Sequence, residues 1–231
     1  MILKEKEALL LDMNNTFMFG EDRFGEDEDF SKYYKSIGGN FSSEYINELI
    51  RCIYKYLEKI YPTEKYRHRF PSLDHAIDAC SREKIGKSEK KKVIDTFSYH
   101  EHGEIPKNYV QALIDLSRQF TMSLVIDIWA PKEMWVNTFK QLEIWALFSA
   151  YSFSSDHGIV KPSPKPFEMV VNELDIPKSK CLVIGDSLRR DLGGAQAAGL
   201  DCILVGGAKS NKALRCFPTL LDFQKSVATC S

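Results

Sequence analysis

The strongest constraint on the fold is an apolar run near the C-terminus that ends in a carboxylate. Residues 181–185 read Cys-Leu-Val-Ile-Gly, Asp186 follows directly, and a second carboxylate, Asp191, comes five positions later. An unbroken apolar run of this length predicts a buried strand. Such a strand would carry the two carboxylates to its C-terminal tip, where open α/β sheets bind their ligands.

A second apolar run has the same ending at the other end of the chain. Residues 7–12 hold Ala-Leu-Leu-Leu before Asp12 and predict a first strand that is buried on both faces. Between the two runs, Lys161 opens the segment Lys-Pro-Ser-Pro-Lys-Pro, a rigid turn, and Lys165 falls at an expected helix start. Three carboxylates and one lysine at one sheet edge would suit a metal-assisted phosphoryl-transfer site.

The composition is that of a soluble globular protein and excludes several kinds of partner. The chain has 231 residues, of which 44% are apolar and 27% charged, enough for one domain plus an insertion. Its 31 basic and 32 acidic residues nearly cancel, so neither nucleic acid nor a membrane surface is an expected partner. No apolar run approaches ~20 residues, and no signal-peptide core is visible. Six scattered cysteines without a C-x-x-C pair favour reduced thiols in a cytoplasmic protein.

From residue 107 onward, apolar runs alternate with amphipathic segments. Strands are expected at 122–127, 149–154, 181–186 and 201–205, and helices at 107–119, 131–147, 164–174 and 189–199. These repeated β-α units predict an α/β fold with a Rossmann-like, doubly wound parallel sheet. Residues 29–100 instead show helical periodicity, with candidate N-caps at Ser42 or Ser43, Ser72 and Ser88. They predict a second, smaller α-helical domain inserted after the first strand.

Three segments together resemble the motifs of the haloacid dehalogenase (HAD)-like hydrolase superfamily. They are Asp12-Met13-Asn14-Asn15-Thr16, Lys161-Pro162-Ser163-Pro164, and Gly185-Asp186-Ser187 with Asp191, in the order that the family has. The resemblance covers roughly residues 5–20 and 105–220. It implies a HAD-like catalytic core over residues 1–20 and 101–231, and a helical cap domain over residues 21–100.

The resemblance also implies a role for each matching residue. Asp12 would be the catalytic nucleophile, forming an aspartyl-phosphate that divides one displacement into two. The cofactor would be Mg²⁺, which prefers oxygen ligands, held by Asp12, the backbone carbonyl of Asn14, Asp186 and, directly or through water, Asp191. Lys161 would offset the negative charge of the nucleophile and of the bound phosphate.

Two positions depart from the family pattern. Family phosphatases have a general acid–base Asp two residues after the nucleophile, where this chain has Asn14. Because such help is worth ~10²–10⁴-fold, its loss falls hardest on poor leaving groups. The family's phosphate-binding Ser or Thr after the second core strand falls on Ile126 or, in another register, on Asp127, and neither is a neutral donor. We interpret Asp127 as a helix-capping or loop carboxylate before Pro131 rather than a group that faces the phosphate.

Two further groups of polar residues have open roles. Glu21 or Asp22, in the acidic loop 21–29, could replace the missing acid, although a solvated face is the simpler interpretation. His100 and His102 are spaced like metal ligands on a strand, but without an evident third ligand we interpret them as a polar linker between cap and core.

The expected function is that of a Mg²⁺-dependent hydrolase of the phosphatase type, acting on a phosphorylated small molecule with weak or atypical activity. A dehalogenase-like hydrolase is the enzymatic alternative, because family members that cleave carbon–halogen bonds use an Asp nucleophile and lack the acid. A catalytically impaired pseudo-hydrolase with a binding role is the third hypothesis.

Overall fold

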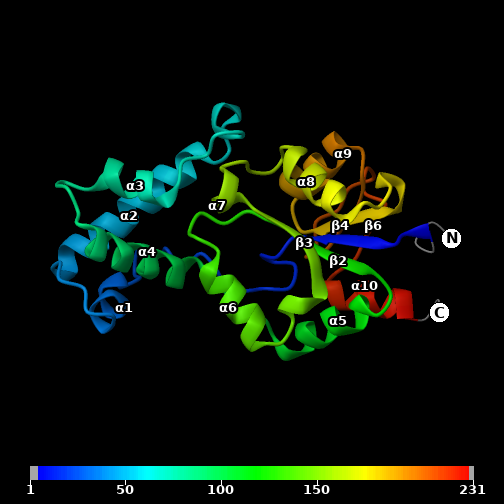
Figure 1. Ribbon diagram of the computed structural model, residues 1–231, viewed down its shortest axis with the longest axis horizontal. Coiled ribbons are helices and arrows are strands. Elements are labelled where there is room, and N and C mark those ends of the chain that lie inside the picture. The colour runs from blue at the N-terminus through cyan, green and yellow to red at the C-terminus, as the bar shows by residue number, and fades with distance from the viewer. Residues whose placement is uncertain (1–4, 229–231) are drawn as a thin grey trace.

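The computed structural model describes residues 5–228 and contains a six-stranded parallel sheet (Figure 1). The strands are β1 (Ala8–Leu11), β2 (Thr121–Ile126), β3 (Phe148–Phe153), β4 (Cys181–Gly185), β5 (Asp201–Leu204) and β6 (Arg215–Cys216). Their order across the sheet is β3-β2-β1-β4-β5-β6, and neighbouring strands are parallel throughout. The Rossmann-like, doubly wound parallel sheet expected from the sequence is confirmed.

β1 lies where the strand order reverses, between β2 and β4. Its last residue, Leu11, pairs with Leu124 on one side and with Ile184 on the other. The next residue, Asp12, still donates its N–H to the Ile184 carbonyl at 2.9 Å. The residues that follow β1 and β4 therefore leave the sheet side by side, in the crevice where sheets of this kind bind ligands.

The two faces of β1 enter two separate hydrophobic clusters. Leu9 and Leu11 belong to a larger cluster that includes residues of α5 (Lys107–Ser117) and α10 (Leu220–Ala228). Ala8 and Leu10 belong to a smaller one that includes residues of α8 (Lys165–Leu174) and α9 (Gly193–Ala198). Figure 1 shows these two helix pairs on opposite faces of the sheet. Because both faces are covered, the strand is apolar without alternation.

The segment between β1 and α5 is helical, as expected. It contains α1 (Phe30–Ser36), α2 (Ser43–Ile60), α3 (Leu73–Cys80) and α4 (Lys87–Glu101), with a 3₁₀ turn at Glu64–Tyr66. We call residues 30–101 the helical insertion; it lies to the left of the sheet in Figure 1. Ser42 and Ser72 accept hydrogen bonds from the backbone at the starts of α2 and α3, so these two predicted caps are confirmed. Ser88 lies inside α4 and does not cap it, because Gly86 is the N-cap residue.

Backbone contacts tie the helical insertion to the core. Phe19 and Glu104, on the two connecting segments, exchange backbone hydrogen bonds of 2.9 and 2.8 Å. The buried carboxylate of Glu101, at the end of α4, accepts from the N–H groups of Trp129 and Ala130 at 2.6 and 2.8 Å. The insertion is thus attached both to the end of β1 and to the loop after β2.

Several core elements differ from the expected ones. The single helix expected at 131–147 is divided, because α6 (Glu133–Gln141) ends before Glu143, whose φ is +59°, and a 3₁₀ turn follows at Trp145–Leu147. The helix expected at 189–199 begins as a π-helical turn, Leu188–Leu192, and continues as α9. The two-residue strand β6 and the helices α7 (Ser154–His157) and α10 were not expected.

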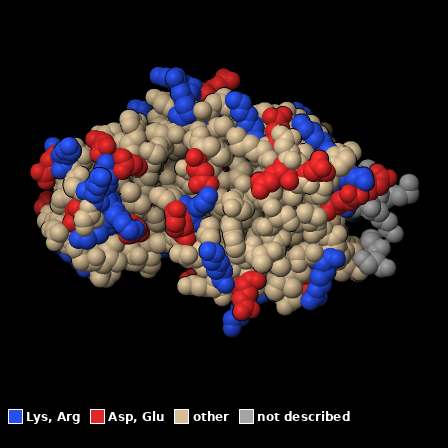
Figure 2. Space-filling model, viewed as in Figure 1, with Lys and Arg blue, Asp and Glu red and all other residues tan. Residues whose placement is uncertain are grey.

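Surface charges and thiols agree with the composition. Basic and acidic side chains are interspersed on the face that Figure 2 shows. Within residues 5–228, each helix is too short or too polar to cross a membrane. The free cysteines are Cys52, Cys80, Cys181, Cys202 and Cys216, and Cys230 lies outside the described residues.

We expect Gly194→Ala to destabilise the fold and Gly193→Ala to be neutral or stabilising. A Cβ at Gly194 would lie 2.5 Å from the Phe167 ring, where α8 and α9 pack, whereas the nearest atoms to a Cβ at Gly193 would be 3.7 Å away. Overpacking costs about 1–3 kcal/mol, while alanine favours the helix over glycine. Urea unfolding of the two variants would measure the difference, and equal losses of stability would contradict this packing argument.

Candidate active site

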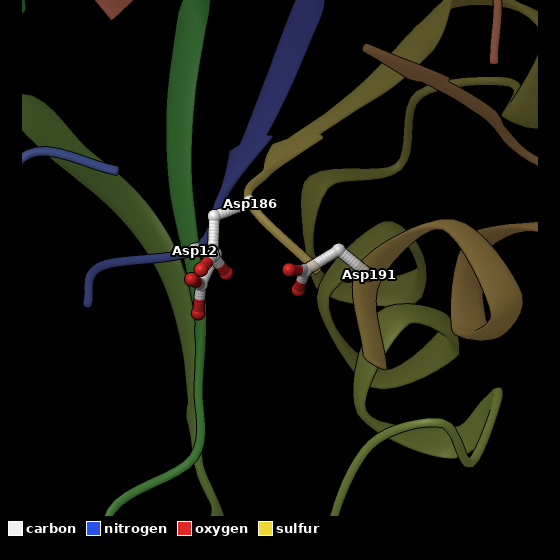
Figure 3. Close-up of side chains that lie close together, drawn as sticks. All are labelled: Asp12, Asp186 and Asp191. Carbon is white, nitrogen blue, oxygen red and sulfur yellow. The ribbon is translucent and has the colours of Figure 1, made fainter. Parts of the chain in front are cut away.

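Three carboxylates converge where β1 and β4 end. Asp12 follows β1, Asp186 follows β4, and Asp191 comes from the π-helical turn. One oxygen from each lies within 4.8 Å of the others, and Figure 3 shows Asp191 pointing from its turn toward the other two. Asp12 and Asp191 are buried, and Asp186 is half-buried. Clustered carboxylate oxygens are the donors that Mg²⁺ and Ca²⁺ prefer.

The turn after β4 holds Asp191 in place. Ser187 caps the turn, because its Oγ accepts from Arg190 N at 3.1 Å, and its own N–H donates to Asp191 Oδ2 at 2.9 Å. The Asp191 carboxyl packs directly on Gly185, where a Cβ would lie 2.3 Å from the carboxyl carbon. Glycine is therefore required at the end of β4, which gives the Gly-Asp-Ser…Asp spacing a structural reason.

Lys161 is the cation at the centre of the carboxylates. Its side chain is 1% exposed, and its Nζ donates to Asp12 Oδ1 at 2.6 Å, to Asp191 Oδ1 at 2.7 Å and to Val125 O at 3.1 Å. An ammonium group has three donors, so all three are used inside the protein. Lys161 is thus brought to Asp12 and Asp191, as the sequence indicated.

The site holds more negative charge than its own cations neutralise. Burial raises the pKa of Asp12 to about 7, with a further rise from the charge of Asp191 and opposition from Lys161 and Arg190. Burial, and then Asp191, raises the pKa of Asp186 as well. Burial alone would lower the pKa of Lys161, but the charges of Asp12 and Asp191 outweigh it and raise that pKa. A bound divalent cation would favour the ionised carboxylates.

Asn14 and Ile126, the two positions that depart from the family pattern, supply neither an acid nor a hydroxyl to the site. Asn14 is half-buried on the loop after Asp12, and its Oδ1 is a buried atom with no hydrogen-bond partner among residues 5–228. Ile126 is 1% exposed and belongs to the larger hydrophobic cluster. Its side chain therefore packs in the core and offers no donor to a ligand.

Asp127 joins the helical insertion to the segment that carries Lys161. Its Oδ2 accepts from the Tyr61 hydroxyl at 2.6 Å and from Lys161 N at 2.9 Å. Of the two sequence interpretations, the loop carboxylate agrees with the structure, and the helix cap does not, because the N-cap residue of α6 is Lys132. Tyr61 directly follows α2, so the insertion also reaches the loop after β2 through this residue, in addition to Glu101.

Sequence reasoning missed two residues of this site, Tyr61 and Arg190. Arg190 lies between Asp186 and Asp191 in the sequence, and its Nη2 lies 3.5 Å from Asp186 Oδ1. Its place inside the Gly-Asp-Ser…Asp motif was a signal that could have found it. Tyr61 carried no such signal, because it comes from the insertion and meets Asp127 only through the fold.

The acidic loop after β1 comes close to the site. Glu21 is half-buried, and its Oε2 has no hydrogen-bond partner in the described part of the chain. Burial raises the pKa of Glu21, and the charge of Asp186 adds to the rise. Asp22, the next residue, is exposed. Of these two residues, Glu21 is the one on which the charge of the carboxylate cluster acts.

His100 and His102 belong to the end of α4 and have separate partners. His100 Nδ1 lies 3.3 Å from Glu28 Oε1, and the His102 ring is hydrogen-bonded to Thr138 Oγ1 at 2.9 Å. Burial lowers the pKa of each ring to about 4. Their interpretation as polar residues at the junction of insertion and core agrees with these contacts.

One segment of the chain matches a family model. Residues 159–220 match the model described as HAD-hydrolase-like, and this stretch includes Lys161, Asp186 and Asp191. A comparison with curated proteins gave no significant match.

The whole fold is similar to solved structures of HAD proteins. A 2-haloacid dehalogenase from Pseudomonas syringae pv. tomato DC3000 is 18% identical, with a TM-score of 0.66 over 98% of this chain and 100% of that one. A HAD phosphatase from Thermococcus onnurineus is 16% identical, with a TM-score of 0.64 over 96% and 97%. CbbY from Rhodobacter sphaeroides, in complex with phosphate, is 18% identical, with a TM-score of 0.59 over 94% and 96%. The fold is thus that of HAD proteins, and residues 159–220 match a HAD-hydrolase-like family model, as the motifs indicated.

We expect Lys161→Met to destabilise the protein far more than Lys165→Met. The first change removes the buried ammonium that pairs with Asp12 and Asp191, whereas Lys165 is exposed at the start of α8. Removal of one partner of a buried ion pair costs about 3–5 kcal/mol. Urea unfolding at pH 7 without added metal would measure both variants. Equal stabilities would mean that the carboxylates do not depend on Lys161 for compensation.

Proposed function

We propose that this protein is a Mg²⁺-dependent hydrolase of the phosphatase type, which acts through Asp12 on a phosphorylated small molecule. The observation that most supports the proposal is the cluster of Asp12, Asp186 and Asp191 at the reversal of strand order. A carboxylate nucleophile that attacks carbon needs no metal, but one that attacks a phosphoryl group is repelled by its oxygens unless a cation neutralises them.

The donors at the site fit Mg²⁺. The carboxylates of Asp12 and Asp186 and the backbone carbonyl of Asn14 would hold the ion, and Asp191 would bind it directly or through water. Burial raises the pKa values of Asp12 and Asp186, and a bound divalent cation would favour their ionised forms. When bound, Mg²⁺ would neutralise the negative charge on the nucleophile and on the phosphoryl oxygens.

The two oxygens of Asp12 suit different tasks. Oδ1 is fixed by the 2.6 Å hydrogen bond from Lys161, whereas Oδ2 has a long contact of 3.4 Å with the Thr16 hydroxyl. Oδ2 would attack phosphorus as the bond to the leaving oxygen breaks, and the leaving oxygen takes that bonding pair. Water would then attack the aspartyl-phosphate, releasing inorganic phosphate and restoring the Asp12 carboxylate.

The activity would be weak or atypical because proton transfer to the leaving group has no evident donor at position 14. The Asn14 amide can hydrogen-bond a leaving oxygen but cannot protonate it. Glu21 or Asp22 could supply the proton from the acidic loop, and the raised pKa of the half-buried Glu21 is in the right direction for an acid.

The helical insertion would act as the cap of this enzyme. We place the cap at residues 21–100 and the catalytic core at residues 1–20 and 101–231. The hydrogen bond from Tyr61 to Asp127 supports this role, because it brings the insertion to the loop beside Lys161. A cap in that position would select the substrate by the shape of its leaving group.

A dehalogenase-like hydrolase is a second candidate, and Asn14 is the residue that favours it. One of the similar solved structures is a 2-haloacid dehalogenase, and an acid at position 14 has no use in attack on carbon. The retained carboxylates Asp186 and Asp191 weigh against this candidate. A pseudo-hydrolase with a binding role would keep metal and phosphate binding without turnover.

The metal site makes a direct prediction for Asp186. Calorimetry should show that the protein binds Mg²⁺ and that Asp186→Asn abolishes binding, because a central carboxylate is lost. Asp175→Asn is the matched control, since Asp175 is exposed at the end of α8 with a φ of +52°, which asparagine adopts readily. Unchanged binding in Asp186→Asn would remove the metal site, and activity that survives a chelator would favour the dehalogenase.

The missing acid makes a second prediction. Wild-type rates should fall steeply as the leaving-group pKa rises from aryl to alkyl phosphates, and Asn14→Asp should flatten this dependence while raising activity up to ~10²-fold. Asp12→Asn should abolish turnover in both backgrounds. A flat dependence in the wild type would mean that Glu21 or Asp22 already supplies the proton. No gain from Asn14→Asp on any phosphate ester would count against phosphatase chemistry.

A further inference from the structure

The donors of Lys161 and of the loop after β2 are already used within the protein. All three Nζ–H groups of Lys161 are donated within the protein. The side chain of Ile126 packs in the core. The backbone N–H groups of residues 128–130, after β2, are donated to Ser154 and to Glu101 at 3.0, 2.6 and 2.8 Å. A phosphoryl group bound here would therefore need donors beyond Lys161 and residues 128–130.

Arg190 is placed to be such a donor. The Ser187 cap fixes its backbone in the same turn that directs Asp191 toward Lys161. The distance of 3.5 Å from its Nη2 to Asp186 Oδ1 is longer than the ~2.7–2.9 Å of a strong charge-assisted hydrogen bond. Its side chain is 30% exposed, whereas that of Asp186 is 19% exposed. The guanidinium thus borders the carboxylate cluster, near the Tyr61 hydroxyl, and its contact with Asp186 is long.

We infer that Arg190 binds the phosphoryl group of the substrate, in place of the Ser or Thr donor that the chain lacks after β2. The inference rests on the proposed function. The planar guanidinium presents paired N–H groups that match two phosphoryl oxygens, which an ammonium cannot do. The weak contact with Asp186 is given up at little cost when stronger acceptors arrive. Arg190 thereby touches the group that is transferred and is a catalytic residue of this site.

The test measures the binding of fluoroberyllate, a phosphoryl mimic, to the Mg²⁺-loaded protein by calorimetry. Arg190→Gln should weaken fluoroberyllate binding by about 10- to 100-fold, the range for hydrogen bonds to charged groups. Arg190→Lys should recover only part of the loss, because lysine restores the positive charge but not the paired N–H groups of the guanidinium. Arg118→Gln is the control and should bind as the wild type does, since Arg118 is exposed at the end of α5, where it pairs with Asp115.

A role limited to neutralising Asp186 gives a different result. Removal of that positive charge would tighten Mg²⁺ binding and leave fluoroberyllate binding unchanged, which would overturn the inference. Mg²⁺ titrations of the same variants therefore accompany the fluoroberyllate titrations, and circular dichroism checks that each variant is folded. A wild-type protein that binds Mg²⁺ but not fluoroberyllate would overturn the proposed phosphatase function itself, a result distinct from failure at Arg190 alone.

Discussion

The buried ammonium of Lys161 is the interaction on which the rest of the site depends. A charge removed from water costs several kcal/mol unless it is paired and hydrogen-bonded. Lys161 meets this requirement with acceptors from three places: Asp12 after β1, the Val125 carbonyl of β2, and Asp191 after β4. The same side chain therefore compensates the proposed nucleophile and fixes the ends of three adjacent strands relative to one another. Fold and chemistry share one set of hydrogen bonds.

The site has its charged groups but lacks an acid at position 14 and a neutral hydrogen-bond donor at position 126. The charged groups that could neutralise a bound ion are Lys161, Arg190 and the carboxylates that pair with them. Groups that act on protons or donate a neutral hydrogen bond are missing at positions 14 and 126. The proposed active site would therefore still bind a cation and an anion together. Its rate would then depend on how readily the leaving group departs unaided.

Much of the fold could be predicted, because β-α repetition is a local pattern. The strands before Asp12 and Asp186 are continuous apolar runs, and parallel strands that end at one edge bring their next residues together. The division of the helix expected at 131–147 could not be predicted, because Glu143 carries no glycine-like signal for its positive φ. Tyr61 and Asp127 are 66 positions apart, and only the path of the insertion brings them into contact.

The contact of Tyr61 with Asp127 has a thermodynamic consequence. One oxygen, Asp127 Oδ2, serves both the insertion, through the Tyr61 hydroxyl, and the backbone of Lys161. A movement of the insertion away from the core would leave that oxygen with the Lys161 N–H and with water. The position of the insertion and the order of the Lys161 segment are then linked equilibria, and linkage is reciprocal. A ligand that orders the Lys161 segment would therefore also favour contact between the insertion and the core. A ligand that favours this contact would likewise order the Lys161 segment.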